Sequence, residues 1–272
     1  MRYVEEMFSL ENVNAVVTGG AGVLPSAMAR VMLRAGARVS IWGRGTHHPV
    51  SDAVDALESE TGAAGRVFGE TVDTADEAAV RETLSRTEAA MGMPNLLVNG
   101  VGGNIGKSDF TEIDTETFSQ VVEMNLLGGL VIPSKVFAAR WKEGAVKASI
   151  INLASMTSFV PLSGVWAYSA AKSAVKNLTE GAARELAPLI RVNAIAPGFF
   201  IGHQNKALLI ANEETGELTE RGRAIIDRTP FGRFGGVEDI EGVTVFLASE
   251  KASGFVTGVT IPVDGGYLTD NI

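Results

Sequence analysis

The 272-residue chain contains no cysteine, which excludes disulfide bonds, thiolate metal sites and a cysteine nucleophile. Basic residues are scarce, since 23 Lys and Arg stand against 32 Asp and Glu, for a formal net charge of −9. Binding to the nucleic-acid backbone needs a basic surface, so no nucleic-acid partner is expected. The sequence shows no run of about 18 apolar residues and no leader-like N-terminus, so we expect no membrane span and a cytoplasmic location.

Apolar residues make up 46% of the chain, enough for the core of one large domain. Short runs rich in Val, Ile and Leu alternate with longer helical patterns. The expected strands are residues 14–18, 38–42, 66–72, 95–99, 149–153, 191–196 and 259–263, and the expected helices are residues 26–35, 50–60, 75–91, 115–141, 167–186 and 237–247. This alternation predicts a single α/β domain over residues 1–272, with a doubly wound, seven-stranded parallel sheet and helices on both faces.

Residues 202–231 interrupt this alternation. The segment is polar, with Glu214, Glu217 and Glu220 among its side chains, and no strand is expected between its helical stretches. An insertion at one edge of the sheet favours a small substrate lid within the domain. A solvated surface excursion is the alternative.

A glycine-rich turn follows the first expected strand and reads Thr18-Gly19-Gly20-Ala21-Gly22-Val23-Leu24-Pro25. Glycines at a first strand–helix turn let backbone amides approach a pyrophosphate, and the helix N-terminus adds free N–H groups. Tight turns also use glycine without any ligand. Because of its place in the α/β pattern, we interpret this turn as a nucleotide site.

The second expected strand ends in Gly43-Arg44. An NAD site usually carries an acidic side chain here, which accepts hydrogen bonds from the ribose hydroxyls. Gly43 lacks that side chain, and the Arg44 guanidinium suits a 2′-phosphate, which it can bind bidentately. NADP(H) is therefore favoured over NAD(H), and a solvated loop arginine is the alternative.

Tyr168 and Lys172 stand four residues apart at the start of an expected helix, so they share one face. A nearby ammonium lowers the pKa of a phenol, as a tyrosine that acts as general acid and base near neutrality requires. Ser155 lies thirteen residues before Tyr168, just after a strand. Ligands bind at the carboxyl ends of strands, where its hydroxyl could donate to a substrate carbonyl.

These motifs together resemble the short-chain dehydrogenase/reductase family over nearly the whole chain. The further residues that carry the likeness are Asp73, residues 98–102, Asn125, Pro197-Gly198 and Pro262-Val263-Asp264-Gly265-Gly266. The resemblance implies a Rossmann fold, an NAD(P)-dependent oxidoreductase acting on CH–OH groups, and a homotetramer or homodimer.

The resemblance also implies a catalytic tetrad of Asn125, Ser155, Tyr168 and Lys172. Tyr168 would exchange a proton with the substrate oxygen, and Ser155 would hold and polarise that oxygen. Lys172 would bind the nicotinamide ribose and lower the pKa of Tyr168, while Asn125 would maintain a water-linked relay to Lys172.

Cofactor contacts are expected where strands end, with Asp73 on the adenine and Asn99 and Gly100 on the adenosine side. The full expected set is Thr18, Gly19, Gly20, Gly22, Val23, Leu24, Gly43, Arg44, Asp73, Thr74, Asn99, Gly100, Tyr168, Lys172, Pro197, Gly198 and Phe200. Three positions depart from the family pattern. Pro25 stands in place of the last turn glycine, Gly100 in place of a second asparagine, and Gly202 where a threonine often contacts the carboxamide.

Within the family, the chain resembles the D-mannonate oxidoreductase (fructuronate reductase) branch. The likeness rests on residues 18–24, 102–107, 197–209 and 218–222. It implies a sugar-acid or ketone substrate, with D-fructuronate and D-mannonate as the leading pair. The alternatives are a reductase of neutral ketoses, polyols or other carbonyl compounds, and a catalytically silent nucleotide-binding protein.

Polar side chains on the loops at the strand ends suit such a substrate. The expected contacts are Asn104, Lys107, Ser155, Thr157, Tyr168, His203, Gln204 and Asn205. The Lys107 ammonium could pair with a sugar-acid carboxylate, and the amides could bond hydroxyl groups. Lys107 could equally be a solvated lysine. His203 has no second ligand beside it in the sequence, so no metal site is expected.

Overall fold

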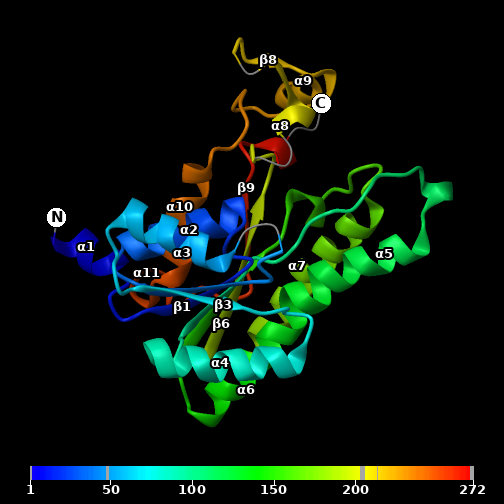
Figure 1. Cartoon of the computed structure of the whole chain (residues 1–272). Helices are drawn as coiled ribbons and strands as arrows, with labels where there is room; N and C mark the ends of the chain where they lie inside the picture. Colours follow the sequence, from blue (N-terminus) through cyan, green and yellow to red (C-terminus); the bar gives the residue numbers. More distant parts are fainter. Residues whose placement is uncertain (1, 47–48, 203–205, 213, 270–272) are drawn as a thin grey trace.

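A central parallel sheet organises the computed structural model, which describes residues 2–46, 49–202, 206–212 and 214–269 (Figure 1). The strands are β1 (Asn14–Thr18), β2 (Arg38–Gly43), β3 (Val67–Thr71), β4 (Leu96–Asn99), β5 (Ala148–Leu153), β6 (Ile190–Pro197) and β9 (Thr260–Val263). Their order is β3–β2–β1–β4–β5–β6–β9, and every pair is parallel. The predicted doubly wound, seven-stranded fold is confirmed.

The central strands are apolar because both of their faces are covered. Every residue of β4, β5 and β6 is buried, which explains their nearly continuous aliphatic sequence. By contrast, β3 lies at one edge of the sheet and alternates between more and less buried positions. The hydrophobic pattern therefore reports the place of each strand in the sheet.

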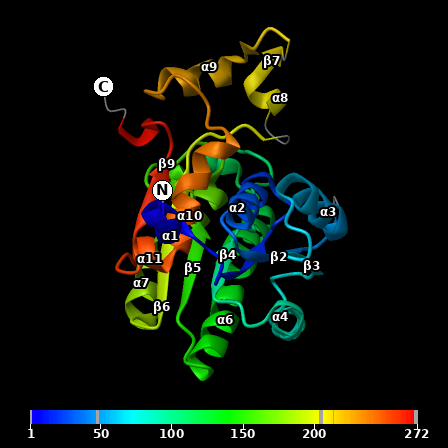
Figure 2. The same cartoon turned by 90° about the vertical axis from the view of Figure 1, so that its left-hand side faces the viewer.

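Helices cover both faces of the sheet (Figure 2). They are α1 (Arg2–Phe8), α2 (Val23–Arg34), α3 (Val50–Thr61), α4 (Glu77–Met91), α5 (Thr115–Val122), α6 (Ile132–Glu143), α7 (Trp166–Leu186), α8 (Lys206–Leu209), α9 (Glu220–Asp227), α10 (Glu241–Ala248) and α11 (Glu250–Ser253). One core cluster joins the sheet to α2, α3 and α10 through Met28, Leu57 and Leu247. A second cluster joins the opposite face to α4 and α6 through Leu84 and Phe137.

The expected helix 115–141 is continuous over Thr115–Glu143 and consists of α5, a π-helical segment η2 (Glu123–Val131) and α6. Its length and composition would allow it to cross a membrane, with a mean hydropathy of 1.4 over its most apolar window. The segment contains no uninterrupted run of 18 apolar residues, because polar side chains such as Glu123 and Asn125 interrupt it. Half of that window is buried inside the fold, so packing against the sheet accounts for its apolar character.

The described part of segment 202–231 projects beyond the carboxyl ends of the strands, where α8, β7 and α9 stand apart from the sheet (Figure 2). It contains a short antiparallel pair, β7 (Ile210–Asn212) and β8 (Glu217–Leu218). The prediction of no strand here was wrong, because strands this short leave no hydrophobic pattern. Leu209 and Ile225 are buried, and the Thr219 hydroxyl caps α9 by accepting from the Gly222 amide at 3.0 Å.

Candidate active site

The glycine-rich turn lies between β1 and α2, where the sheet order reverses from β2 on one side to β4 on the other. Gly19 adopts a φ of +66°, which glycine tolerates best. A Cβ on Gly20 would lie 2.5 Å from the Ile41 Cβ, so only glycine fits. Gly22 precedes α2 as its N-cap and has no side chain, so no capping side chain accepts hydrogen bonds from the first-turn amides of Val23 and Leu24. The turn therefore suits a pyrophosphate.

Two of the positions that depart from the family pattern, Pro25 and Gly100, lie against each other. A Cβ on Gly100 would lie 2.7 Å from the Pro25 Cγ and 2.4 Å from the Thr18 carbonyl oxygen. The Thr18 backbone and the proline ring together leave no room for a side chain at position 100. The Thr18 hydroxyl accepts from the Gly100 amide at 3.1 Å, which joins the end of β1 to the loop after β4.

The ends of β2 and β3 lie side by side, because Gly43 pairs with Thr71. Arg44 is exposed immediately after β2. A Cβ on Gly43 would contact only the Val50 Cγ2, at 3.7 Å, so packing does not require glycine there. After β3, the exposed Asp73 carboxylate accepts from the Ala75 amide at 3.0 Å, and Thr74 is buried. The fold would therefore admit an acidic residue at position 43, and the chain has none.

Ser155, Tyr168 and Lys172 come together beyond β5, as the sequence predicted for neighbouring strand and helix ends. The Lys172 Nζ lies 5.6 Å from the centre of the Tyr168 ring and donates to the Leu153 carbonyl at 2.8 Å. Ser155 is buried, and its hydroxyl accepts from the Thr157 amide at 3.2 Å. Three groups able to hold or move a proton thus share one location.

Burial sets the proton affinities of these groups. It raises the pKa of the Tyr168 phenol, while a hydrogen bond with Ser155 acts to lower that pKa. Burial also lowers the pKa of the Lys172 ammonium to about 8, because the charged form loses its hydration. The sequence predicted that the Lys172 ammonium lowers the pKa of Tyr168. In the protein without ligands the pKa of Tyr168 is raised instead, because desolvation is the larger effect. Tyr168 holds its proton at neutral pH.

Asn125 is fully buried in the π-helical segment η2, a type of helix that often marks functional sites. Its side-chain Oδ1 accepts from the Gly103 amide at 3.0 Å, and its Nδ2 donates to the Gly103 carbonyl at 2.6 Å. Nδ2 also donates to the Val121 carbonyl at 2.8 Å. The side chain thus ties η2 to the loop that follows β4. The sequence alone does not indicate this contact.

The Asn99 side chain points into the fold. Its Nδ2 donates to the Ser134 hydroxyl and to the Asn152 Oδ1, both at 2.8 Å. Asn152 in turn donates to the Thr179 hydroxyl at 2.9 Å. Asn99 therefore connects β4 and β5 to α6 and α7 through its side chain, and its predicted contact with the adenosine stays a prediction.

The loop after β4 lines a cavity of about 280 Å³ together with the start of α5 and α7. Asn104, Lys107 and Trp166 are among its lining residues. The Lys107 stem lies against Gly164, and Glu112 and Asp114 bring acidic groups to the same cavity. The sequence did not single out Trp166, Glu112 or Asp114, since loop spacing alone does not show which segments meet.

Thr157 is also buried near the trio, and its hydroxyl has no hydrogen-bond partner within the described residues. An unpaired buried hydroxyl can bond a ligand. His203, Gln204 and Asn205 lie outside the described residues, so their predicted contacts stay predictions.

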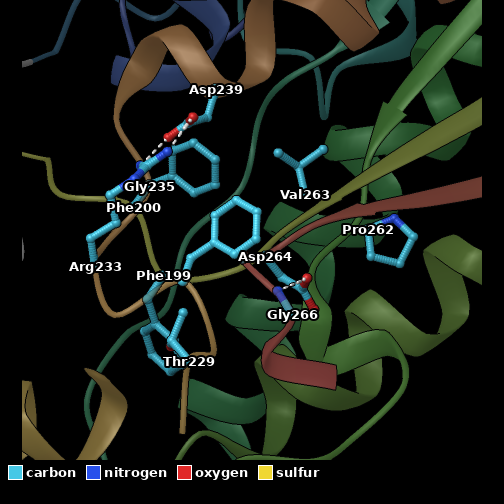
Figure 3. A pocket seen from close by; sticks show the side chains of 12 residues that line it. Phe199, Phe200, Thr229, Arg233, Gly235, Asp239, Pro262, Val263, Asp264 and Gly266 are labelled. Carbon is cyan, nitrogen blue, oxygen red and sulfur yellow. Dashed lines mark hydrogen bonds and ion pairs between the residues drawn. The ribbon is translucent and has the colours of Figure 1, made fainter. Parts of the chain in front are cut away.

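Pro197 ends β6, and Gly198, Phe199 and Phe200 follow it on the way to α8. Figure 3 shows the two phenylalanine rings beside Val263 and Asp264, in a cavity of about 240 Å³. A Cβ on Gly202 would lie 3.3 Å from the Val23 Cγ2. The loop thus closes against the glycine-rich turn, and a branched side chain at position 202 would crowd Val23.

The cavity in Figure 3 also holds an ion pair that the sequence did not predict. Arg233 donates to both carboxylate oxygens of Asp239, at 2.6 and 2.8 Å. The Arg233 guanidinium and the Gly236 amide lower the pKa of Asp239 to about 2. This pair braces the segment that leads from α9 to α10. Within the described residues, no cluster of His, Asp and Glu could hold a metal ion.

The doubly wound sheet, the glycine-rich turn and the Ser155–Tyr168–Lys172 trio define a nucleotide-dependent oxidoreductase. A family model described as enoyl-(acyl carrier protein) reductase matches residues 23–268. The chain belongs to the short-chain dehydrogenase/reductase family.

Similar proteins agree with this assignment. An uncharacterized oxidoreductase of Bacillus subtilis, UxuB, is 39% identical over 277 residues, covering 96% of each chain. A Haemophilus influenza protein provisionally named D-mannonate oxidoreductase, solved with bound NAD, matches with a TM-score of 0.87 and 32% identity, covering 98% of this chain and 99% of that one. An Agrobacterium tumefaciens protein provisionally named 2-deoxy-D-gluconate 3-dehydrogenase, solved with bound NADP, matches with a TM-score of 0.83 and 32% identity, covering 96% and 98%.

Proposed function

We propose that this protein transfers a hydride between a nicotinamide cofactor and a sugar-acid ketone or alcohol, with D-fructuronate and D-mannonate as the leading pair. The observation that carries the proposal is the convergence of Ser155, Tyr168 and Lys172 beyond β5, in a sheet whose first strand ends in a glycine-rich turn where Gly20 has no room for a side chain. The names given to two similar structures support a sugar-acid substrate.

The bound nicotinamide supplies or accepts the hydride. In the reduction, the Tyr168 phenol donates its proton to the substrate oxygen, and the Ser155 hydroxyl donates a hydrogen bond to the same oxygen. The amide of Thr157 holds Ser155 in place. The Lys172 ammonium, charged below about pH 8, stabilises the phenolate that forms. Asn125 maintains the relay through which Tyr168 regains a proton.

NADP(H) is the cofactor we favour. Arg44 follows β2 at the position where a 2′-phosphate would be bound, and the fold leaves space at Gly43 for an acidic side chain that the sequence lacks. Similar structures contain either NAD or NADP, so this preference rests on Gly43 and Arg44.

The substrate's carboxylate would pair with Lys107 and one of its hydroxyls with Asn104, at the cavity beside the start of α7. Thr157, whose buried hydroxyl has no partner within the described residues, would bond another hydroxyl. His203, Gln204 and Asn205 would complete the contacts from the lid. Residues 202–231 would cover the bound substrate, since they project from the sheet's carboxyl end (Figure 2).

A second substrate class is favoured by one observation. Glu112 and Asp114 line the same cavity as Lys107, and their carboxylates would repel an anion. A neutral ketose or polyol would avoid this repulsion and accept hydrogen bonds from the same loop.

The decisive experiment is a spectrophotometric screen of sugar acids, ketoses and polyols with both NADH and NADPH, following the absorbance of the reduced nicotinamide. Tyr168→Phe serves as the control and is expected to lose about 10²–10⁴-fold in kcat. An unchanged rate in this variant would refute the mechanism. Cofactor binding without turnover of any carbonyl compound would point instead to a silent nucleotide-binding protein.

A further inference from the structure

Gly102, the first residue of the substrate loop 102–107, lies against two members of the proposed tetrad. A Cβ placed on it would be 2.6 Å from the Asn125 Oδ1 and 3.0 Å from the Lys172 Nζ. Its backbone does not occupy the left-handed region, unlike that of Gly106 in the same loop. Space, and not backbone conformation, is therefore what requires glycine at position 102.

Neither neighbour of Gly102 is free to give way without loss. Asn125 is fully buried, and its side chain makes three hydrogen bonds, two of them to the Gly103 backbone. Lys172 is 4% exposed and is held by the Leu153 carbonyl. An added methyl group would have to break one of these bonds or push the loop outward.

We propose that Gly102 is a positioning residue. Because it has no side chain, the substrate loop can pack closely against the Asn125 amide and the Lys172 ammonium and hold both groups in place. The part that concerns Lys172 rests on the function proposed above. Because residue 102 begins the loop that carries Asn104 and Lys107, this contact links the substrate loop directly to the group that stabilises the Tyr168 phenolate.

The test is Gly102→Ala, with Gly181→Ala as the matched control. Gly181 lies on α7, the helix that carries Lys172, and a Cβ there would meet open space. In the protein without ligands, we expect Gly102→Ala to lower Tm by about 2–8 °C. Gly181→Ala is expected to leave Tm unchanged or higher, because alanine favours helix.

A double variant identifies the contact responsible. Asn125→Ala removes the amide that the new methyl group would strike, so Gly102→Ala should lower Tm much less in that background than in the wild type. This comparison also applies if Gly102→Ala alone fails to fold, since the double variant should then recover folding. Equal destabilisation in both backgrounds, or failure of the double variant to fold while Asn125→Ala folds, would overturn the proposal.

The pH profile tests the effect on the proton-transfer groups. The Lys172 ammonium lies 5.6 Å from the centre of the Tyr168 ring and donates to the Leu153 carbonyl, and a Cβ on Gly102 would lie 3.0 Å from it. A displaced ammonium stabilises the phenolate less, so the rise of kcat/KM for alcohol oxidation should move to higher pH, with an about 10- to 100-fold loss at neutral pH. A wild-type profile in Gly102→Ala would overturn the proposal. If the wild type itself turns over no substrate, the proposed function fails, whereas the Tm comparison still decides the steric contact.

Discussion

Lys172→Met is expected to make the unfolding free energy of the ligand-free protein depend less on pH between pH 7 and 10. It is also expected to abolish turnover. The Lys172 ammonium is buried, and burial lowers its pKa from the ordinary value of 10.5 to about 8. Methionine has a similar length and no charge, so it removes the desolvation cost. It also leaves the Leu153 carbonyl without the donor that it has at 2.8 Å.

The size of the change in unfolding free energy follows from the different pKa values of Lys172 in the folded and unfolded states. One pKa unit corresponds to about 1.4 kcal/mol, so the lowered pKa of Lys172 costs the folded state about 3 kcal/mol when the ammonium is charged in both states. Below pH 8 the cost is fully present. Between pH 8 and 10.5 the unfolded chain keeps its proton while the folded protein loses it, so the stability of the wild type rises with pH. The lost hydrogen bond to Leu153 costs the variant about 1–3 kcal/mol at every pH.

Urea unfolding of both proteins at pH 7, 8, 9 and 10 measures this difference. The variant should equal or exceed the wild type in unfolding free energy at pH 7 and fall below it at pH 10, a relative change of about 2–3 kcal/mol. Lys251→Met, which removes an exposed lysine on α11, controls for the loss of one charge and should show the same small difference at each pH. A difference between Lys172→Met and wild type that stays constant from pH 7 to 10 would refute the reasoning.

Three further predictions concern the ligands. Arg44→Asp should weaken NADPH binding tenfold or more and strengthen NADH binding, measured by nicotinamide fluorescence; equal losses for both cofactors would argue against a 2′-phosphate contact. Lys107→Met should raise KM for carboxylated substrates about tenfold and leave KM for neutral ketoses unchanged in steady-state assays, and a uniform effect would assign Lys107 no role in charge pairing. Gly20→Ala, which places a methyl group 2.5 Å from the Ile41 Cβ, should weaken binding of both cofactors and lower Tm, whereas Gly181→Ala should do neither.

The sheet was predictable because each buried strand is short, aliphatic and bounded by turns. All seven strands of the main sheet occur within two residues of their expected ends. The β7–β8 pair was missed, since Glu217–Leu218 has only two residues.

For the candidate site, the sequence by itself determined which groups stand at strand and helix ends: the glycine-rich turn, Ser155, and Tyr168 with Lys172 one helical turn apart. Only the tertiary structure decided which loops touch them. The contacts of Gly102 with Asn125 and of Pro25 with Gly100 join segments far apart in the sequence, and no local pattern encodes such distances. Burial likewise decided that the pKa of Tyr168 rises and that of Lys172 falls, because desolvation depends on everything packed around a group and not on its neighbours in sequence.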